Sequence, residues 1–247
     1  MTLPDLSLVI PVYNEVENLP VLAEEIHVAL AGSAHTFEVI WVDDGSTDGS
    51  GASLERLCAG DRRHRLVRLM KNQGQSAALA AGFRRTRGAV TVTLDSDLQN
   101  DPRDIPSLLA ALEGHDLVSG VRVTRRDSWV RRWSSRVANR VRSWVLEDGV
   151  TDVGCSLKAY RTEYLRHLPE FKGMHRFLPA LVLMQGGRLR ELPVNHRPRR
   201  FGVAKYGIGN RLWRGLADLG GVAWLKKRWI DPRLERELTP PPEVERP

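Results

Sequence analysis

The chain has 247 residues, enough to bury a sizeable hydrophobic core in one large domain or two small ones. Its 42% hydrophobic and 27% charged residues are typical of a globular protein and exclude a disordered or fibrous one. Two cysteines exclude a disulfide framework and favour a reducing, cytoplasmic environment. The net charge of +7 is unevenly distributed: residues 1–120 carry 10 Lys and Arg against 17 Asp and Glu, and residues 121–247 carry 27 against 13.

The first 120 residues alternate between two hydrophobic patterns. Short β-branched runs predict strands, at 6–13, 37–43, 65–70, 89–95 and 116–121. Helical spacing of apolar residues predicts helices between them, near 19–30, 73–87 and 105–112. This alternation predicts an α/β fold with a mostly parallel sheet and helices on both faces. No G-x-G-x-x-G follows the first strand and no G-x-x-x-x-G-K-[ST] occurs, which argues against a dehydrogenase or a P-loop NTPase.

The pattern changes in the second half of the chain. It predicts an amphipathic helix at 128–146, a strand at 155–160, a helix near 174–185, a strand near 188–194 and a second amphipathic helix at 209–230. Both amphipathic segments are rich in tryptophan and basic residues, which suits a helix lying on an anionic membrane surface. Packing of the tryptophans into the protein core is the alternative, since most amphipathic helices are structural. The Pro-rich, charged residues 231–247 predict a disordered tail.

Three predicted strands end in polar groups. The first runs into residues 11–15, the second into 43–50 and the fourth into 95–99. Open α/β sheets bind ligands beyond the carboxyl ends of their strands, so these groups are expected to meet in one cleft. Asp95 and Asp97 would repel each other without a nearby cation, and Asp97 with the Gln99 amide oxygen suits Mg²⁺ or Mn²⁺. Simple turns that cap the following helices are the alternative interpretation of both acidic motifs.

The motifs taken together resemble one known family. Their order is PVYNE, VDDGSTDGS, NQGQSAALAAGF and LDSDLQNDP, which resembles the inverting family 2 glycosyltransferases of GT-A (Rossmann-like) fold. Further segments are similar to the polyprenyl-phosphate branch that contains dolichyl-phosphate mannosyltransferase: GVRVTRR, RRWSSRVANR, DVGCSLKAYR, MHRFLPAL and HRPRRFGVAKYG. The resemblance covers about residues 6–215.

This resemblance implies a GT-A domain over 1–208, with a nucleotide-sugar half at 1–120 and an acceptor half at 121–208, followed by the membrane-interface helix at 209–230. The implied nucleotide-binding residues are Pro11, Tyr13, Glu15, Val42, Asp44, Asp95, Ser96 and Lys205. The implied ligands of Mg²⁺ or Mn²⁺ are Asp97 and Gln99. The implied residues for catalysis and for the lipid phosphate are Asp97, Arg122, Arg132, Arg199, Ser135 and Arg136.

The resemblance implies transfer of a sugar, with inversion, from GDP-mannose or a UDP-sugar to an undecaprenyl or dolichyl phosphate. A phosphate is already an anion at neutral pH and needs no general base. Transfer to a hydroxyl acceptor with Asp152 as the base is the alternative. A basic nucleic-acid-binding module would explain the arginines but neither the acidic half nor the D-x-D motif, so no nucleic acid partner is expected.

Many members of the branch continue into transmembrane helices, whereas this sequence shows no apolar run of that length. We therefore expect a cytoplasmic protein, bound peripherally to the inner face of the cell membrane. A separate membrane partner or a homo-oligomer would supply additional attachment.

Overall fold

The computed structural model describes residues 3–123, 140–201 and 211–230. Within them, seven strands form one sheet in the order β3-β2-β1-β4-β6-β5-β7. Their bounds are β1 Leu6–Val12, β2 Phe37–Asp43, β3 His64–Arg68, β4 Val90–Thr93, β5 Leu117–Arg122, β6 Lys158–Arg161 and β7 Leu189–Val194. Neighbouring strands run parallel except β6, which is antiparallel to both β4 and β5. The predicted mostly parallel sheet is confirmed, and β6 is the departure from it.

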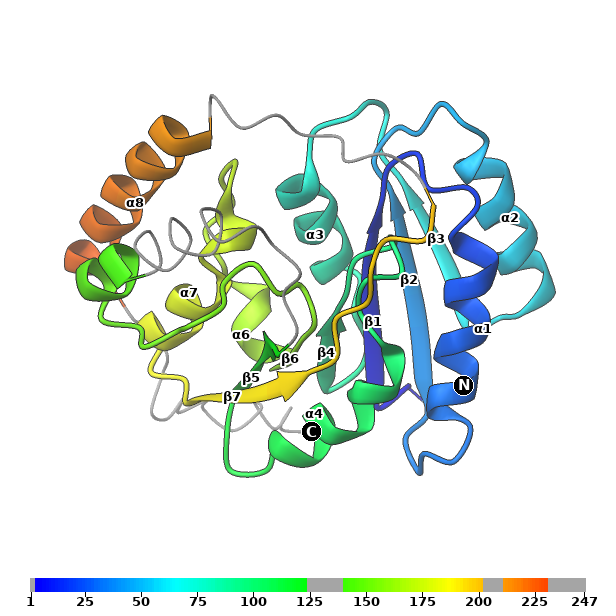
Figure 1. Cartoon of the computed structure of the whole chain (residues 1–247), viewed down its shortest axis with the longest axis horizontal. Coiled ribbons are helices and arrows are strands. Elements are labelled where there is room, and N and C mark those ends of the chain that lie inside the picture. The colour runs from blue at the N-terminus through cyan, green and yellow to red at the C-terminus, as the bar shows by residue number, and fades with distance from the viewer. Residues whose placement is uncertain (1–2, 124–139, 202–210, 231–247) are drawn as a thin grey trace, which may run out of the picture.

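Helices cover both faces of the sheet, as predicted (Figure 1). One face carries α1 Leu19–Leu30, α2 Ser50–Gly60, the short 3-10 helix η1 Pro102–Asp104 and α4 Ile105–Ala111. The other carries α3 Gln75–Phe83, α6 Glu163–Arg166, η2 Met174–Arg176, α7 Leu178–Met184 and α8 Arg211–Arg228. The helix predicted near 174–185 is thus divided in two, because α7 begins anew with Pro179 in its first turn.

The two cores follow from the alternation of side chains along each strand. In β1, Leu8 and Ile10 pack under α1, whereas Val9 between them faces α3, and all three are fully buried. On the α3 side the approach is close, since a Cβ on Gly82 would lie 2.3 Å from Val9 Cγ1. Glycine at this position therefore lets α3 sit directly on β1.

A histidine pair lies at the amino end of β3. The indole N–H of Trp41 donates to His64 Nδ1 over 2.8 Å, so His64 carries its proton on Nε2 and donates it to His27 Nε2 over 2.8 Å. Asp61 Oδ2 is near enough to make a three-ligand metal cluster with them, but it already pairs with Arg63 at 2.6 Å. Burial, with a smaller contribution from His27, lowers the pKa of His64 to about 4.

This pKa shift predicts a pH dependence of folding stability. Below pH 6.5 the unfolded chain protonates His64 while the folded chain resists it, so the stabilisation present at neutral pH is lost as pH falls toward 4, up to about 3 kcal/mol. Urea unfolding at pH 7.5 and pH 5 should therefore show a smaller loss of stability in His64→Gln than in the parent. The exposed His35 supplies the control His35→Gln. An unchanged pH slope in His64→Gln would contradict the assignment.

The last residues of the predicted amphipathic helix at 128–146 pack beside α8. Residues 140–146 are helical, and Lys226 of α8 donates to the Leu146 carbonyl oxygen over 2.7 Å. Arg142 of this segment is buried and pairs with Asp148 and the Val150 carbonyl oxygen. The buried carboxylate gives the guanidinium an internal partner, which offsets the cost of burying its charge.

Most of the predicted helix at 128–146 and the whole tail at 231–247 lie outside the described residues. Among those described, no helix combines the length and the apolar character that crossing a membrane requires. The helix predicted at 209–230 is present as α8.

Candidate active site

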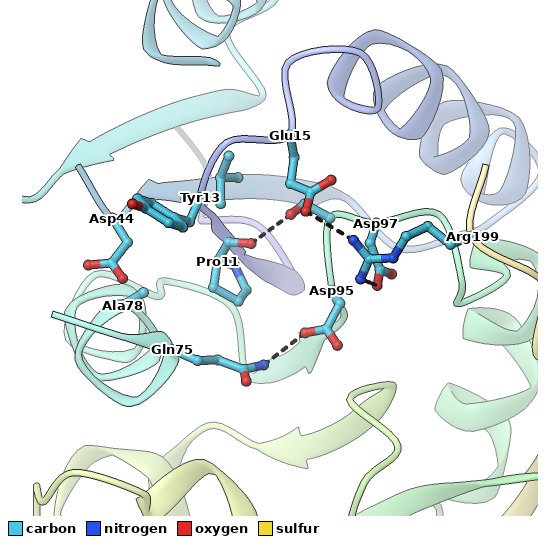
Figure 2. Close-up of a pocket in the computed structure, with 11 residues that line it drawn as sticks. Pro11, Tyr13, Glu15, Asp44, Gln75, Ala78, Asp95, Asp97 and Arg199 are labelled. Carbon is cyan, nitrogen blue, oxygen red and sulfur yellow. Dashed lines mark hydrogen bonds and ion pairs between the residues drawn. The ribbon is translucent and has the colours of Figure 1, made fainter. Parts of the chain in front are cut away.

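A pocket opens where the strand order reverses. The chain adds β2 and β3 on one side of β1 and then β4 on the other, which makes the gap between the carboxyl ends of β1 and β4 a topological switch point. The pocket at this point is lined by Pro11, Val12, Tyr13, Glu15, Asp44, Gln75, Ala78, Asp95, Ser96, Asp97 and Arg199 (Figure 2). The predicted convergence of three strand ends on one cleft is confirmed by this geometry.

The loop after β1 is fixed by its neighbour after β2. Asn14 adopts a left-handed conformation with φ 53°, its backbone N–H donates to Ser46 Oγ, and its side-chain oxygen accepts from the Thr47 N–H. Asparagine tolerates this backbone conformation better than most residues. The turn brings Glu15, which is 8% exposed, to the rim of the pocket, where its backbone N–H donates to Ser50 Oγ.

Asp44 ties the second loop to the start of α3. Its two carboxylate oxygens accept from the backbone N–H groups of Gln73 and Gly74 over 2.7 and 2.8 Å. Burial nevertheless raises the pKa of Asp44. The carboxylate thus sets the position of α3 relative to β2 and also lines the pocket, where its remaining lone pairs are available to a ligand.

The D-x-D residues follow β4 and leave it through a sharp turn. Leu98 is buried with φ 61°, a costly conformation for a branched residue, and it turns the chain between Asp97 and Gln99. Ser96 donates to the Pro11 carbonyl oxygen over 3.0 Å, which joins this loop to β1. Burial raises the pKa of Asp97, and burial together with the Asp97 charge raises that of Asp95.

One cation already faces this carboxylate cluster. Arg199 donates from Nη2 to Asp97 Oδ2 over 2.7 Å, and its Nη1 lies 3.5 Å from Glu15 Oε1 (Figure 2). That Nη1 is buried and makes no hydrogen bond to the described residues. The pocket therefore presents an arginine N–H beside a cluster of carboxylates, a combination suited to a phosphate that binds together with a cation.

A divalent cation fits the donor set. The oxygens of Asp95, Asp97 and Glu15 converge on the pocket, and oxygen ligands are the ones that Mg²⁺ and Mn²⁺ prefer. The pKa values of both aspartates are raised because burial outweighs the nearby positive charges, which are Arg199 beside Asp97 and Lys158 and Arg122 near Asp95. Asp97 is the residue best placed to hold such an ion.

A second ion pair lies beside this cluster. Arg122, at the end of β5, donates from Nε and Nη2 to the two carboxylate oxygens of Asp152, each over 2.8 Å, and both side chains are largely buried. A carboxylate held in this bidentate way by a guanidinium is a poor base, since the pairing favours its ionised form without a proton. Asp152 therefore acts here as the anchor of Arg122.

Eight of the predicted site residues line the pocket, namely Pro11, Tyr13, Glu15, Asp44, Asp95, Ser96, Asp97 and Arg199. Val42 does not, because its side chain is fully buried in the core against α3. Gln99 and Arg122 also lie outside the lining, and the Gln99 amide nitrogen is 3.5 Å from the Arg197 carbonyl oxygen. The remaining predicted residues, Arg132, Ser135, Arg136 and Lys205, are outside the described part of the chain.

Gln75 is a pocket residue that the sequence did not single out. It stands at the first position of α3 and donates from Nε2 to Asp95 Oδ1 over 2.8 Å (Figure 2). Its motif, NQGQSAALAAGF, was noted, but a glutamine at a helix start carries no chemical signature by itself. Only the packing of α3 against β1 and β2 brings it to the aspartate.

The α/β fold with its acidic pocket at the switch point is that of a GT-A glycosyltransferase, and comparison with known proteins agrees. The sequence model of the family described as Glycosyl transferase family 2 matches residues 7–168. The chain belongs to this family and is a glycosyltransferase.

Among curated proteins, the chain is 38% identical over 229 residues to a dodecaprenyl-phosphate galacturonate synthase of Rhizobium johnstonii, covering 90% of this chain and 68% of that protein.

Solved structures with a similar fold include glucosyl-3-phosphoglycerate synthase of Mycobacterium tuberculosis. Its complex with Mn²⁺, UDP-glucose and glycerol 3-phosphate gives a TM-score of 0.63 at 21% identity, over 91% of this chain and 79% of that one. Its complex with Mg²⁺ and UDP gives 0.62 at 20% identity, over 91% and 78%. At this identity the likeness supports the fold alone.

Proposed function

We propose that this protein transfers a sugar, with inversion and with the help of a divalent metal, from a nucleotide-sugar donor to a polyprenyl phosphate. The observation that carries the proposal is the pocket at the β1–β4 switch point, where Asp44 and Asp95 line the same cleft as the ion pair of Asp97 with Arg199. The similarity to a dodecaprenyl-phosphate galacturonate synthase supports a lipid phosphate as the acceptor. Metal and UDP in the solved structures of similar fold support the donor side.

Each group in the pocket has a role in this reaction. Asp44 and Tyr13 would bind the nucleoside, and Asp97 would hold the divalent ion, with Gln99 two residues further along the chain. The ion, when bound, neutralises the diphosphate leaving group. Arg199 donates from Nη1 to the same diphosphate, and its ion pair with Asp97 keeps it near the place where that charge develops.

The acceptor needs orientation rather than deprotonation. A phosphate oxygen is nucleophilic without a base, which agrees with Asp152 being engaged by Arg122. Arg122 positions the sugar and the incoming phosphate through its planar guanidinium. The hydroxyl-acceptor alternative requires a free carboxylate base at this place, and the bidentate pair disfavours it.

The donor assignment is tested by thermal shift. A panel of GDP, UDP and their sugars is added to the protein with Mn²⁺, with Mg²⁺ or with a chelator. One nucleotide series should raise the melting temperature, and the rise should disappear with the chelator. An absence of any metal-dependent shift across the panel contradicts a nucleotide-sugar enzyme.

The helical segment 140–146 and the outer side of α8 form a candidate membrane face. Trp144 is 81% and Trp224 63% exposed, and Lys227 and Arg228 lie exposed beside Trp224. Exposed tryptophans next to basic residues suit the headgroup region of an anionic bilayer. This surface supports peripheral attachment at the inner face of the cell membrane, where a lipid phosphate is reached.

We expect the double variant Trp144→Ser/Trp224→Ser to lose binding to phosphatidylglycerol-containing vesicles by about tenfold or more, because both rings leave the interface. Vesicle co-sedimentation at fixed ionic strength measures this. Met70, fully exposed near the end of β3, supplies the control Met70→Ser, which removes an exposed apolar side chain elsewhere. Equal binding by the double variant and the parent rules this face out.

A further inference from the structure

An isolated antiparallel bridge joins the residues after β7 to the end of the D-x-D loop. The bridge pairs Asn100 with His196, and the Arg197 N–H donates to the Gln99 carbonyl oxygen over 2.8 Å. Two residues further along, Arg199 makes its 2.7 Å hydrogen bond to Asp97. The position of Arg199 in the pocket therefore depends on how the residues just before it are held at this bridge.

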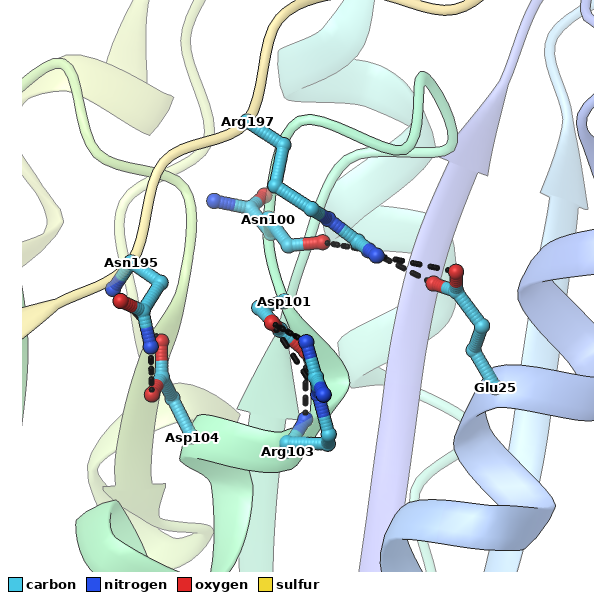
Figure 3. Close-up of polar contacts among 7 residues, drawn as sticks. All are labelled: Glu25, Asn100, Asp101, Arg103, Asp104, Asn195 and Arg197. Carbon is cyan, nitrogen blue, oxygen red and sulfur yellow. Dashed lines mark hydrogen bonds and ion pairs between the residues drawn. The ribbon is translucent and has the colours of Figure 1, made fainter.

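The bridge is supported by side chains that alternate along the segment. Asn195 donates from its backbone N–H and from Nδ2 to the two carboxylate oxygens of Asp104 in η1, and Arg197 donates to the Asn100 carbonyl oxygen over 2.8 Å (Figure 3). The side chains of residues 195, 197 and 199 thus contact the segment 97–104 that follows β4, as the period of an extended chain allows.

Arg197 also forms an ion pair with a third element, α1. Its Nη1 and Nη2 donate to Glu25 Oε1 and Oε2 of α1 over 2.9 and 2.6 Å (Figure 3). One guanidinium therefore joins α1, the D-x-D loop and the segment after β7. A bidentate pair of this kind fixes direction as well as distance, which an ordinary surface ion pair does not.

We propose that Glu25 is a positioning residue for the transfer reaction: by holding Arg197 it stabilises the bridge after β7 and so keeps Arg199 beside Asp97. Glu25 is not among the residues that line the pocket, so its effect passes through Arg199. The expected effect on catalysis rests on the proposed function, whereas the expected effect on the stability of the bridge does not.

The structural part is tested by hydrogen exchange. In Glu25→Gln the backbone amide of Arg197, which donates to the Gln99 carbonyl oxygen, should exchange about tenfold faster than in the parent, because the bridge opens more often. Glu24, exposed one residue earlier on α1, gives the control Glu24→Gln, which should exchange as the parent does. Unchanged exchange in Glu25→Gln overturns the proposal, whatever the enzyme's activity.

The functional part is tested by a double-mutant cycle with Arg199→Ala. Glu25→Gln alone should lower kcat about fivefold with KM for the nucleotide sugar less affected, because Arg199 lies where the charge of the leaving group develops. In the Arg199→Ala background it should have no further effect, since Arg199 is the group it positions. An equal effect in both backgrounds means that Glu25 acts otherwise and overturns the proposal. Absence of turnover in the parent contradicts the proposed function. The hydrogen-exchange result then still shows whether Glu25 stabilises the bridge.

Discussion

Asp97→Ala is expected to reduce sugar transfer by about a thousandfold or more, because it removes both the principal ligand of the divalent ion and the partner of Arg199. The variant should fold, since Asp97 is a buried carboxylate with a raised pKa and its loss removes a desolvated charge. Initial rates under saturating donor and Mn²⁺ measure the first effect, and the melting temperature without metal measures the second.

Asp152→Asn provides the contrast. The asparagine retains one acceptor for Arg122, so transfer should fall by only about tenfold. An Asp152→Asn enzyme that is as inactive as Asp97→Ala, with metal and donor binding intact, would assign Asp152 as a base. A nearly normal rate in Asp97→Ala would show that transfer does not require a metal ion held by Asp97.

The largest effect on stability is expected from Asp148→Ala. Arg142 and Asp148 form a pair in which both side chains are less than a tenth exposed, so the alanine leaves a buried guanidinium without its counter-charge. Loss of one member of such a pair costs about 3–5 kcal/mol, a large part of the stability of a domain. Guanidinium chloride unfolding at neutral pH measures the loss.

The matched control for Asp148→Ala is Arg140→Ala. Arg140 lies exposed on the same helical segment, and its replacement should change the free energy of unfolding by less than about 0.5 kcal/mol. A loss below about 1 kcal/mol in Asp148→Ala would show that the pair contributes little and that water reaches Arg142.

The parallel part of the fold was predictable because its central strands, β1 and β2, are buried on both faces and therefore show a continuous apolar run. β1 and β2 match their predicted ranges to within one residue, and so their carboxyl ends could be placed together. β6 was predicted as a strand, but its antiparallel direction depends on pairing with β4 and β5 across more than thirty residues. Nothing in the local pattern of KAYR encodes that direction.

The residues of the candidate site were likewise predictable only in part. Residues at strand ends, such as Asp44 and Asp97, were predictable because topology alone brings them to one edge. Gln75 and Glu25 were not, since each acts through a contact with a residue distant in the chain. Val42 was misplaced because a strand residue next to a pocket turns its side chain into the core at alternate positions.

The uneven charge of the sequence corresponds to this arrangement. The carboxylates of the first half line the cleft at the switch point, and Arg199 of the second half pairs there with Asp97. Opposite charges from the two halves thus meet in one pocket.

The central claim is tested most directly by following labelled sugar from a nucleotide-sugar panel into matched lipids. Polyprenyl phosphate and the corresponding polyprenol are presented in anionic vesicles with Mn²⁺. The lipid products are then separated and identified by mass spectrometry. The account predicts metal-dependent transfer of one sugar to the phosphate and none to the alcohol. Transfer to the alcohol, or binding of the donor without transfer to either lipid, would contradict it.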